Sequence, residues 1–483
     1  MVFNSFSFLV FFPVVVLVYG IIPRKLRLYW LLAASYYFYM SWNAAYAALI
    51  LTSTVTTWGC ALLMQGKEKK QKKYLLALNL IINFGILFVF KYMGFFLLLF
   101  GKRLSFDLLL PVGISFYTFQ AAGYTIDVYR DDTEAERNFF LYALFVSFFP
   151  QLVAGPIERS KNLLGRLRKL EEVRVWEYDR MLSGLRLMLW GLFLKVVIAD
   201  RIAVVADTVF AHPWKYGSFE LMAGVFAFSI QIYCDFDAYS TIATGAARVM
   251  GIGLMDNFRT PYFAQGMADF WRRWHISLST WFRDYVYVPL GGSRKGKPRK
   301  YLNILITFTL SGLWHGAARR FVVWGALHGL LRVAGECVSP LTKRLKETFG
   351  IRQDVFSFRF GKALYTSVLA GICWVFFRAE SLTSALYYLK RMFTRWNPWV
   401  LFDGGLYELG IDRFEGNVLK AALLTMLAVS IVRVKTGKDF GEVLAGQNML
   451  FRFAVCILLI LSLLVYGFYG VDFDSTQFLY FQF

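Results

Sequence analysis

The sequence predicts an all-α integral membrane protein with roughly 11 to 13 membrane segments, some of them re-entrant. Of its 483 residues, 57% are hydrophobic and 19% are aromatic, and the mean hydropathy is +0.48. A water-soluble globular protein of this length rarely has such a composition. The apolar stretches are long and continuous and do not alternate with a period of two, so they predict helices rather than a barrel of strands.

The apolar segments follow one another along the chain, separated by charged connectors. Each helical span needs about 20 mostly apolar residues to cross roughly 30 Å of hydrocarbon. The first segment has no basic region before it and no small-residue cleavage motif, so we expect a retained span. The candidates in order are Phe6 to Ile22, Leu28 to Trp42, Ala44 to Met64, Tyr74 to Phe90, Leu108 to Val128, Phe139 to Pro156, Met181 to Ala199, Phe219 to Tyr239, Tyr301 to Trp314, Phe321 to Val333, Ala363 to Phe377, Val418 to Val432 and Phe453 to Tyr469.

Proline and glycine interrupt two of these segments, at Pro111-Val-Gly113 and between Pro150 and Pro156. Backbone groups freed inside a membrane need protein or a watery cavity around them, so the breaks predict an internal chamber. A full crossing from Phe139 to Pro156 would place the basic stretch Arg159 to Arg174 on the side opposite Arg130 to Arg137. A re-entrant hairpin avoids this conflict with the positive-inside rule.

Two further stretches are predicted to lie at the cytoplasmic surface. Within Arg159 to Arg174, leucines recur at helical spacing and indicate an amphipathic helix. The second surface stretch is Ser339 to Gly361. The leucines are Leu163, Leu164, Leu167 and Leu170.

Charge and cysteine usage exclude several classes of protein. Lys and Arg number 53 against 32 Asp and Glu, for a formal charge of +21. This charge is spread over short connectors without a recognisable binding module, so it indicates membrane topology and anionic lipid rather than nucleic acid. The five cysteines stand singly, which is typical of packing residues, and the dispersed histidines do not predict a metal site.

The densest polar cluster is Asp269-FWRRWHISLSTWFRDYVYVPLGGS-Arg294. It is too polar for a free span and too aromatic for a solvated loop. On one continuous helix, Trp271, His275 and Ser279 would share a face by i, i+4 spacing. An interfacial helix anchored by tryptophans is the plain interpretation, and a histidine-containing active site is the alternative.

A second histidine, His315, ends the apolar run that begins at Tyr301. An ionisable group in a span is costly to bury and often functional, and imidazole can take a proton from a hydroxyl near neutral pH. Ser311 and Gly312 would let another backbone approach, and Trp314 can wall a cavity. A hydrogen-bonded structural role for His315 stays open at this point.

The remaining histidines and carboxylates suggest supporting roles. His328 has no comparable polar surroundings, so we expect a structural role, and His212 is expected in a surface loop. Asp235, Asp237 and Tyr239 lie in a polar stretch within an apolar segment. Such carboxylates are paired, protonated or in contact with water, and they would orient a histidine, hold an arginine or line a tunnel.

The two histidine-containing stretches, residues 269–294 and SGLWHG at 311–316, together resemble the membrane-bound O-acyltransferase family, in particular its bacterial polysaccharide branch. The related D-alanyl transferases of teichoic acid share the arrangement, but RDYVYVPLGG is more similar to the alginate-type branch. Further stretches that resemble that branch are MVFNSFSFLVFFP (1–13), PVGISFYTFQ (111–120), FPQLVAGPIER (149–159), DFDAYSTIATGAARVMGI (235–252) and FLYFQF (478–483).

The resemblance implies a ring of tilted helices around a central tunnel through the membrane. It implies that His315 is catalytic, as general base or as transient carrier of the acyl group, and that His275 is the second active-site histidine. Residues 1–483 would form one membrane domain, with a catalytic core at about 108–335 and flanking helices at 1–107 and 336–483. Donor-binding or tunnel-lining residues are expected at Trp271, Arg272, Arg273, Trp274, Ser279, Asp235, Asp237, Tyr239, Ser311 and Trp314.

The implied function is O-acetylation of an extracytoplasmic polysaccharide by an enzyme of the bacterial inner or plasma membrane. Acetyl-CoA or an acyl carrier protein thioester is the expected donor, with no bound cofactor, and a separate extracytoplasmic acetyltransferase protein is the expected partner. Basic loops such as Arg294 to Lys300 would meet the donor's phosphates or an acidic carrier. The alternatives are a D-alanyl transferase that uses a carrier protein, and a proton-coupled transporter or flippase whose histidine relays protons.

Overall fold

The computed structural model describes residues 1–102 and 110–468, and within these ranges the chain is helical without strands. This confirms the predicted all-α class. In chain order the helices are α1 (Phe6–Ile21), α2 (Arg27–Met40), α3 (Ala47–Met64), α4 (Lys69–Leu87), α5 (Met93–Leu99), α6 (Ile114–Tyr129), α7 (Phe139–Ser147), α8 (Phe149–Leu152), α9 (Ser160–Leu167), α10 (Tyr178–Leu192) and α11 (Asp200–Ala211). They continue with α12 (Ser218–Val249), α13 (Met267–Arg273), α14 (Ile276–Phe282), α15 (Gly296–His315), α16 (Arg319–Thr348), α17 (Phe356–Arg378), α18 (Leu382–Thr394), α19 (Arg413–Thr436), α20 (Phe440–Ala445) and α21 (Met449–Tyr466).

Three π-helical segments occur within the described residues, each continuous with a neighbouring α-helix. They are η3 (Phe88–Tyr92), η4 (Phe193–Ala199) and η7 (Arg283–Tyr287). Through η4, the predicted span Met181 to Ala199 becomes part of one longer helical stretch from α10 to α11.

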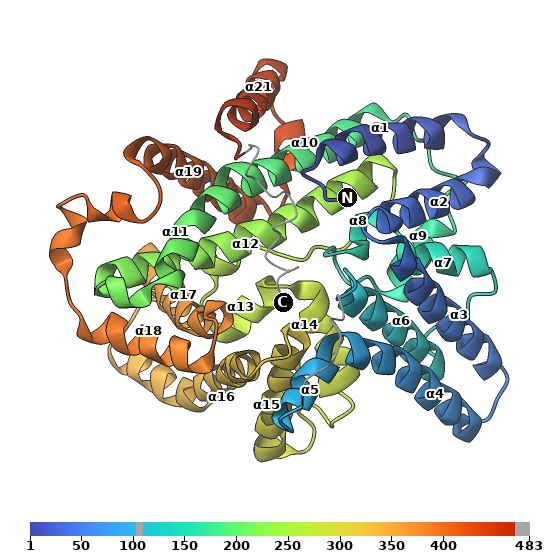
Figure 1. The fold of residues 1–483 in the computed structure, drawn as a ribbon, viewed down its shortest axis with the longest axis horizontal. Helices are drawn as coiled ribbons and strands as arrows, with labels where there is room; N and C mark the ends of the chain where they lie inside the picture. Colours follow the sequence, from blue (N-terminus) through green and yellow to red (C-terminus); the bar gives the residue numbers. More distant parts are fainter. Residues whose placement is uncertain (103–109, 469–483) are drawn as a thin grey trace.

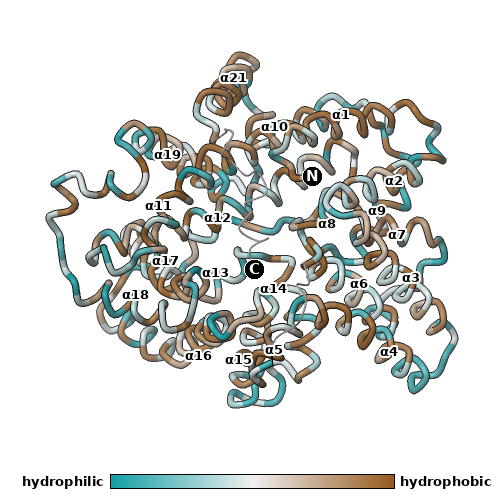
Figure 2. Tube along the Cα trace, viewed as in Figure 1, coloured by the Kyte–Doolittle hydropathy of each residue, from teal (hydrophilic) through white to brown (hydrophobic). Residues whose placement is uncertain are grey.

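The helices surround a middle region where α8, α12, α13 and α14 lie, with α1 to α4, α6 and α7 on one side, α16 to α18 on the other, and α5 and α15 at the lower edge between them (Figure 1). Seven helices of the described residues are at least 18 residues long and apolar enough to cross a membrane, and α1 is a shorter apolar helix. Ile81 on α4 and Leu464 on α21 are 70% and 71% exposed, which is expected of side chains that face lipid. Figure 2 shows hydrophobic colour along the helices and hydrophilic colour at connectors such as the start of α4.

The basic connectors meet on one face of the molecule, which we call the basic face (67–73, 130–137 and 159–174). Ion pairs join these connectors to one another and to η7. By the positive-inside rule this face is expected to be cytoplasmic. The pairs are Lys72–Asp131 (2.5 Å), Arg168–Glu136 (2.7 Å) and Arg159–Asp284 (2.9 Å).

The segment from α7 to α9 enters and returns on the same side. It breaks at Phe148, between α7 and α8, and the Arg168–Glu136 pair joins the residues that follow and precede it. This supports the predicted re-entrant hairpin. Leu163, Leu164 and Leu167 do lie on a helix, but they are buried against the protein rather than in the bilayer surface.

Two local predictions differ from the structure. The stretch 339–361 is exposed over most of its length, as expected of a surface segment, but it is not one loop, because α16 continues through Pro340 to Thr348 and α17 already begins at Phe356. Trp271, His275 and Ser279 do not share one helical face, because the chain breaks at His275 into α13 and α14. The expected start of a span at Leu108 and the FLYFQF motif lie outside the described residues.

Candidate active site

His315 is the last residue of α15, and its side chain is buried inside the helical assembly with 4% exposure. Neither ring nitrogen has a hydrogen-bond partner among the described residues. Buried polar atoms are normally paired, so both nitrogens of this imidazole can accept or donate a hydrogen bond to a small molecule or to water. The helix ends here because the next residue, Gly316, has extended backbone.

Glycines explain how α15 and α16 approach closely around His315. A Cβ atom on Gly312 would lie 2.2 Å from the carbonyl oxygen of Phe321, and one on Gly325 would lie 2.3 Å from that of Phe308. These distances are shorter than any side chain allows, so the contact requires glycine. The close packing brings Trp324 to within 5.1 Å of His315 between ring centroids.

His275 forms the junction between α13 and α14, with a φ of 43° that is unusual for a residue other than glycine. Its Nδ1 lies 3.1 Å from Oδ1 of Asn257. The same oxygen accepts from the Ser277 hydroxyl at 2.9 Å, and the Asn257 amide donates to Ser240 at 3.1 Å. The asparagine therefore presents an acceptor to Nδ1, so this nitrogen carries the proton and Nε2 carries the lone pair.

The two imidazoles lie close together in an aromatic enclosure. The ring centroids of His275 and His315 are 6.3 Å apart, and Nε2 of His275 also lacks a hydrogen-bond partner in the described part of the chain. Trp314 packs against both rings, at 6.1 Å from His275 and 4.9 Å from His315. Phe116 and Phe377 contact His275 and His315 respectively. Such walls exclude water and strengthen electrostatic interactions inside.

Asn257 was not identified from the sequence. It follows α12 in a loop, 18 positions before His275, and no motif marks it as a partner of the histidine. Its side chain orients His275, a role for which the sequence suggested Asp235 or Asp237.

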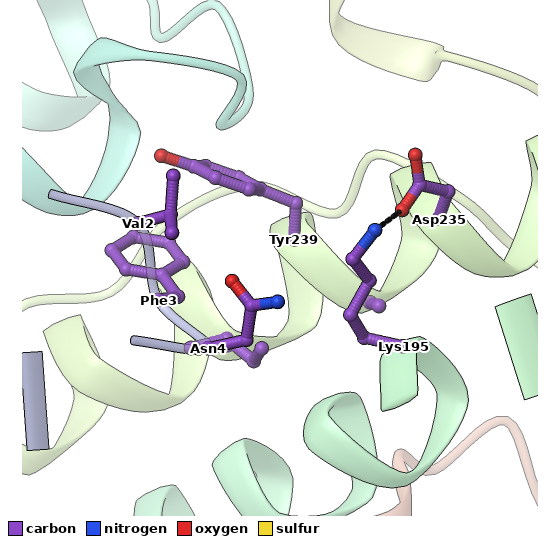
Figure 3. Close-up of a pocket in the computed structure, with 8 residues that line it drawn as sticks. Val2, Phe3, Asn4, Lys195, Asp235 and Tyr239 are labelled. Atoms are coloured by element: carbon purple, nitrogen blue, oxygen red, sulfur yellow. Dashed lines mark hydrogen bonds and ion pairs between the residues drawn. The ribbon is translucent and has the colours of Figure 1, made fainter. Parts of the chain in front are cut away.

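Those two carboxylates have other partners. Asp235 pairs with Lys195 of η4 at 2.6 Å, and Lys195 also pairs with Asp200 at 2.8 Å. Asp235 and Lys195 line a small pocket together with Tyr239, whose ring stacks on Phe3 (Figure 3). The sequence suggested that Asp235 orients a histidine, holds an arginine or lines a tunnel, and in the structure it pairs with a lysine and lines this small pocket.

Asp237 accepts a hydrogen bond from the Thr241 hydroxyl at 3.4 Å, one turn further along α12. Ser311 is buried on α15, one turn before His315. Ser279 donates to the carbonyl of Trp274 at 3.2 Å, and Trp274 packs on Trp374.

Trp271 donates to Nδ1 of His328 at 3.2 Å. This bond agrees with the structural role expected of His328. Arg272 and Arg273 both pair with Asp269, at 3.7 Å and 3.1 Å. Their guanidinium groups therefore pair within α13, which ends at Arg273, and His275 lies beyond the end of this helix.

Residues 135–372 match the membrane-bound O-acyltransferase (MBOAT) family, and this range contains both histidines. The sequence is 38% identical over 394 residues to a probable alginate O-acetylase, AlgI, of Pseudomonas syringae pv. tomato, covering 79% of this chain and 73% of that protein. The chain belongs to the membrane-bound O-acyltransferase family. As a member of that family it is a multi-pass membrane enzyme that transfers acyl groups to oxygen.

Other similar proteins include the probable alginate O-acetylase AlgI of Azotobacter vinelandii, 37% identical over 92% of this chain and 87% of that protein. The peptidoglycan O-acetyltransferase of Helicobacter pylori is 35% identical over 75% of this chain and 73% of that protein. A teichoic acid D-alanyltransferase of Bacillus subtilis is more distant, at 29% identity over 49% of this chain and 61% of that protein. Membership of an acyltransferase family favours enzymatic chemistry over the transporter alternative.

Proposed function

We propose that this membrane-bound O-acyltransferase moves acetyl groups from a thioester donor on the basic face to hydroxyl groups of a polysaccharide outside the cytoplasm. The observation that carries the proposal is the buried pair His275 and His315, with three free ring nitrogens facing an apolar enclosure. The alginate and peptidoglycan O-acetyltransferases among its relatives support acetyl as the group and a polysaccharide as the acceptor. A bacterial inner or plasma membrane is the corresponding location.

The chemistry needs one base close to the acceptor hydroxyl. The histidine takes the hydroxyl proton as the oxygen attacks the thioester carbonyl carbon, the carbon–sulfur bond breaks, and the thiolate leaves and takes the proton. We assign the base to His315 and a supporting role to His275, whose lone pair is fixed at Nε2 by Asn257. In the alternative route, His315 attacks the thioester itself and holds the acetyl group until an acceptor arrives.

We place the acyl donor at the basic face and a partner protein at the opposite, extracytoplasmic face. Acetyl-CoA and an acyl carrier protein thioester both carry phosphate, and Arg272, which is 74% exposed, offers a guanidinium for it. A tunnel from the basic face past the histidines would carry the acetyl group across, and a separate extracytoplasmic protein would complete transfer to the sugar. The core at 108–335 would be completed by flanking side chains such as Phe377, which contacts His315.

The decisive experiment compares His315→Ala with His328→Ala and His212→Ala in membrane vesicles supplied with labelled acetyl-CoA or acetyl carrier protein. We expect His315→Ala to lose at least about 100-fold in transfer, whereas the exposed His212 and the structural His328 keep their activity per folded molecule. Label recovered on the protein would select the covalent route. Retained transfer by folded His315→Ala would refute the proposal, and mild alkaline release of D-alanine rather than acetate would replace acetyl with D-alanyl.

A further inference from the structure

A lysine lies inside a membrane-spanning segment at Lys91. It belongs to the π-helical segment η3, within the candidate span Lys69–Leu98. A charged side chain there is retained when it has a specific partner or function. The proposed acetyl transfer does not use it directly, and the sequence did not single it out.

The partners of Lys91 are at the end of α15. Its Nζ donates to the backbone carbonyl of Trp314 at 2.7 Å and to the hydroxyl of Ser115 at 3.3 Å. The ammonium also lies 5.6 Å from the centroid of the Trp314 ring. The neighbouring residue, Tyr92, donates its hydroxyl to the carbonyl of Leu313 at 3.1 Å.

These contacts provide hydrogen-bond donors to the carbonyl groups at the C-terminal end of α15. The last carbonyls of a helix have no partner within the helix, and the helix dipole places partial negative charge there. Because α15 stops at His315, the carbonyls of Leu313 and Trp314 lie in its last turn. The ammonium of Lys91 and the phenol of Tyr92 bind these carbonyls, so the C-terminus of α15 is capped by η3.

The π-helical geometry lets two consecutive residues serve this cap. On a regular α-helix, the side chains of neighbouring residues point about 100° apart. In η3 the turn is wider, and the side chains of Lys91 and Tyr92 both reach α15. Segments of this kind are frequent at functional sites. The capped peptide immediately precedes His315, whose own ring makes no hydrogen bond within residues 1–102 and 110–468.

We propose that Lys91, assisted by Tyr92, is a positioning residue for His315: it fixes the end of α15 and thereby the orientation of the imidazole. This inference rests on the proposed role of His315 in acetyl transfer. Lys91 acts through the backbone of Trp314, so its removal is expected to lower the rate of the chemical step more than the binding of the donor.

The test uses the full-length protein in nanodiscs, with labelled acetyl-CoA and acetyl carrier protein as separate donor arms. Lys91→Arg keeps the charge and a donor, Lys91→Gln keeps a donor only, and Lys91→Met keeps neither. We expect kcat to fall in that order, with Lys91→Met at least tenfold below the wild type, KM for the donor within twofold, and Tyr92→Phe between them. Lys435→Met is the matched control, since Lys435 is an exposed lysine on α19, a candidate span that lies outside the basic face.

A second readout separates this inference from the proposed function. Hydrogen–deuterium exchange in the peptide that contains residues 313–318 is expected to rise in Lys91→Met and Tyr92→Phe and to stay unchanged in Lys435→Met. Should Lys91→Met fail to fold, Lys91→Gln and Tyr92→Phe carry the same expectation. Equal kcat in all variants of an active wild type would overturn the inference alone, as would unchanged exchange at the end of α15. A wild type that is inactive with both donors would instead refute the proposed function. The exchange measurement would then still show whether Lys91 and Tyr92 fix the end of α15.

Discussion

Replacing Asn257 by alanine tests whether His275 must be held in one orientation and one tautomer. The substitution removes the acceptor of His275 Nδ1 at 3.1 Å, the acceptor of the Ser277 hydroxyl at 2.9 Å, and the donor to Ser240 at 3.1 Å. Each bond contributes about 0.5–1.5 kcal/mol net, so Asn257→Ala is expected to lower the free energy of unfolding by about 3 kcal/mol.

The effect on catalysis is separate. His275 has a φ of 43°, and such a backbone costs about 1–3 kcal/mol unless its surroundings hold it. Without Asn257 the ring is free to turn and to move its proton to Nε2. If this raises the barrier by about 2 kcal/mol, kcat falls about 30-fold, since about 1.4 kcal/mol corresponds to a factor of ten.

The assay measures kcat for acetyl transfer per folded molecule, together with the melting temperature. Asn257→Asp keeps an oxygen for Nδ1 and is expected to retain more activity than Asn257→Ala. Asn303→Ala is the control: Asn303 is also buried, but it donates to the carbonyls of Leu290 and Gly292. A folded Asn257→Ala enzyme with the kcat of the wild type would refute the reasoning, and so would an equal loss of kcat in Asn303→Ala.

Two further predictions concern stability. Gly312→Ala places a methyl group 2.2 Å from the Phe321 carbonyl oxygen, so it is expected to lower the free energy of unfolding by about 1–3 kcal/mol. Gly335→Ala is the control, because it has open space around it and should not lower the melting temperature. Equal melting temperatures for the two variants would contradict the close contact. Burial raises the pKa of Glu158 to about 7, despite its hydrogen bond from the Met255 amide. The unfolded state then loses this proton at lower pH than the native state does, so the free energy of unfolding should fall as pH rises from about 4.5 to 7 and level off above. Glu158→Gln should flatten this slope when denaturation is measured across the same pH range.

The spans and the two histidines could be predicted because their signals are local. Hydrophobic length identifies a membrane segment within its own residues, and His315 stands out against the apolar run before it. The re-entrant hairpin could also be predicted from the sequence, because the charges on either side of Phe139 to Pro156 constrain the side of the membrane to which the chain returns.

The partners of the histidines could not be predicted for the opposite reason. Lys91 lies 223 positions before Trp314, whose carbonyl it reaches, and Asn257 lies 18 positions before His275, with the short helix α13 between them. The break at His275 was missed because helical spacing continues through it, and a positive φ at histidine leaves no mark on composition. Such features depend on tertiary packing that outweighs local preference.

The π-helical segments have a consequence for insertions and deletions. Each of η3, η4 and η7 contributes a charged side chain to an internal contact or ion pair, namely Lys91, Lys195 and Asp284. Deleting one residue within such a segment would convert it to a regular α-helix and rotate everything beyond it by about 100°, turning the charge away from its partner while leaving hydropathy almost unchanged. Homologous sequences that differ in length at these segments are therefore expected to have lost or relocated the corresponding charge, whereas length changes in the connectors carry no such requirement.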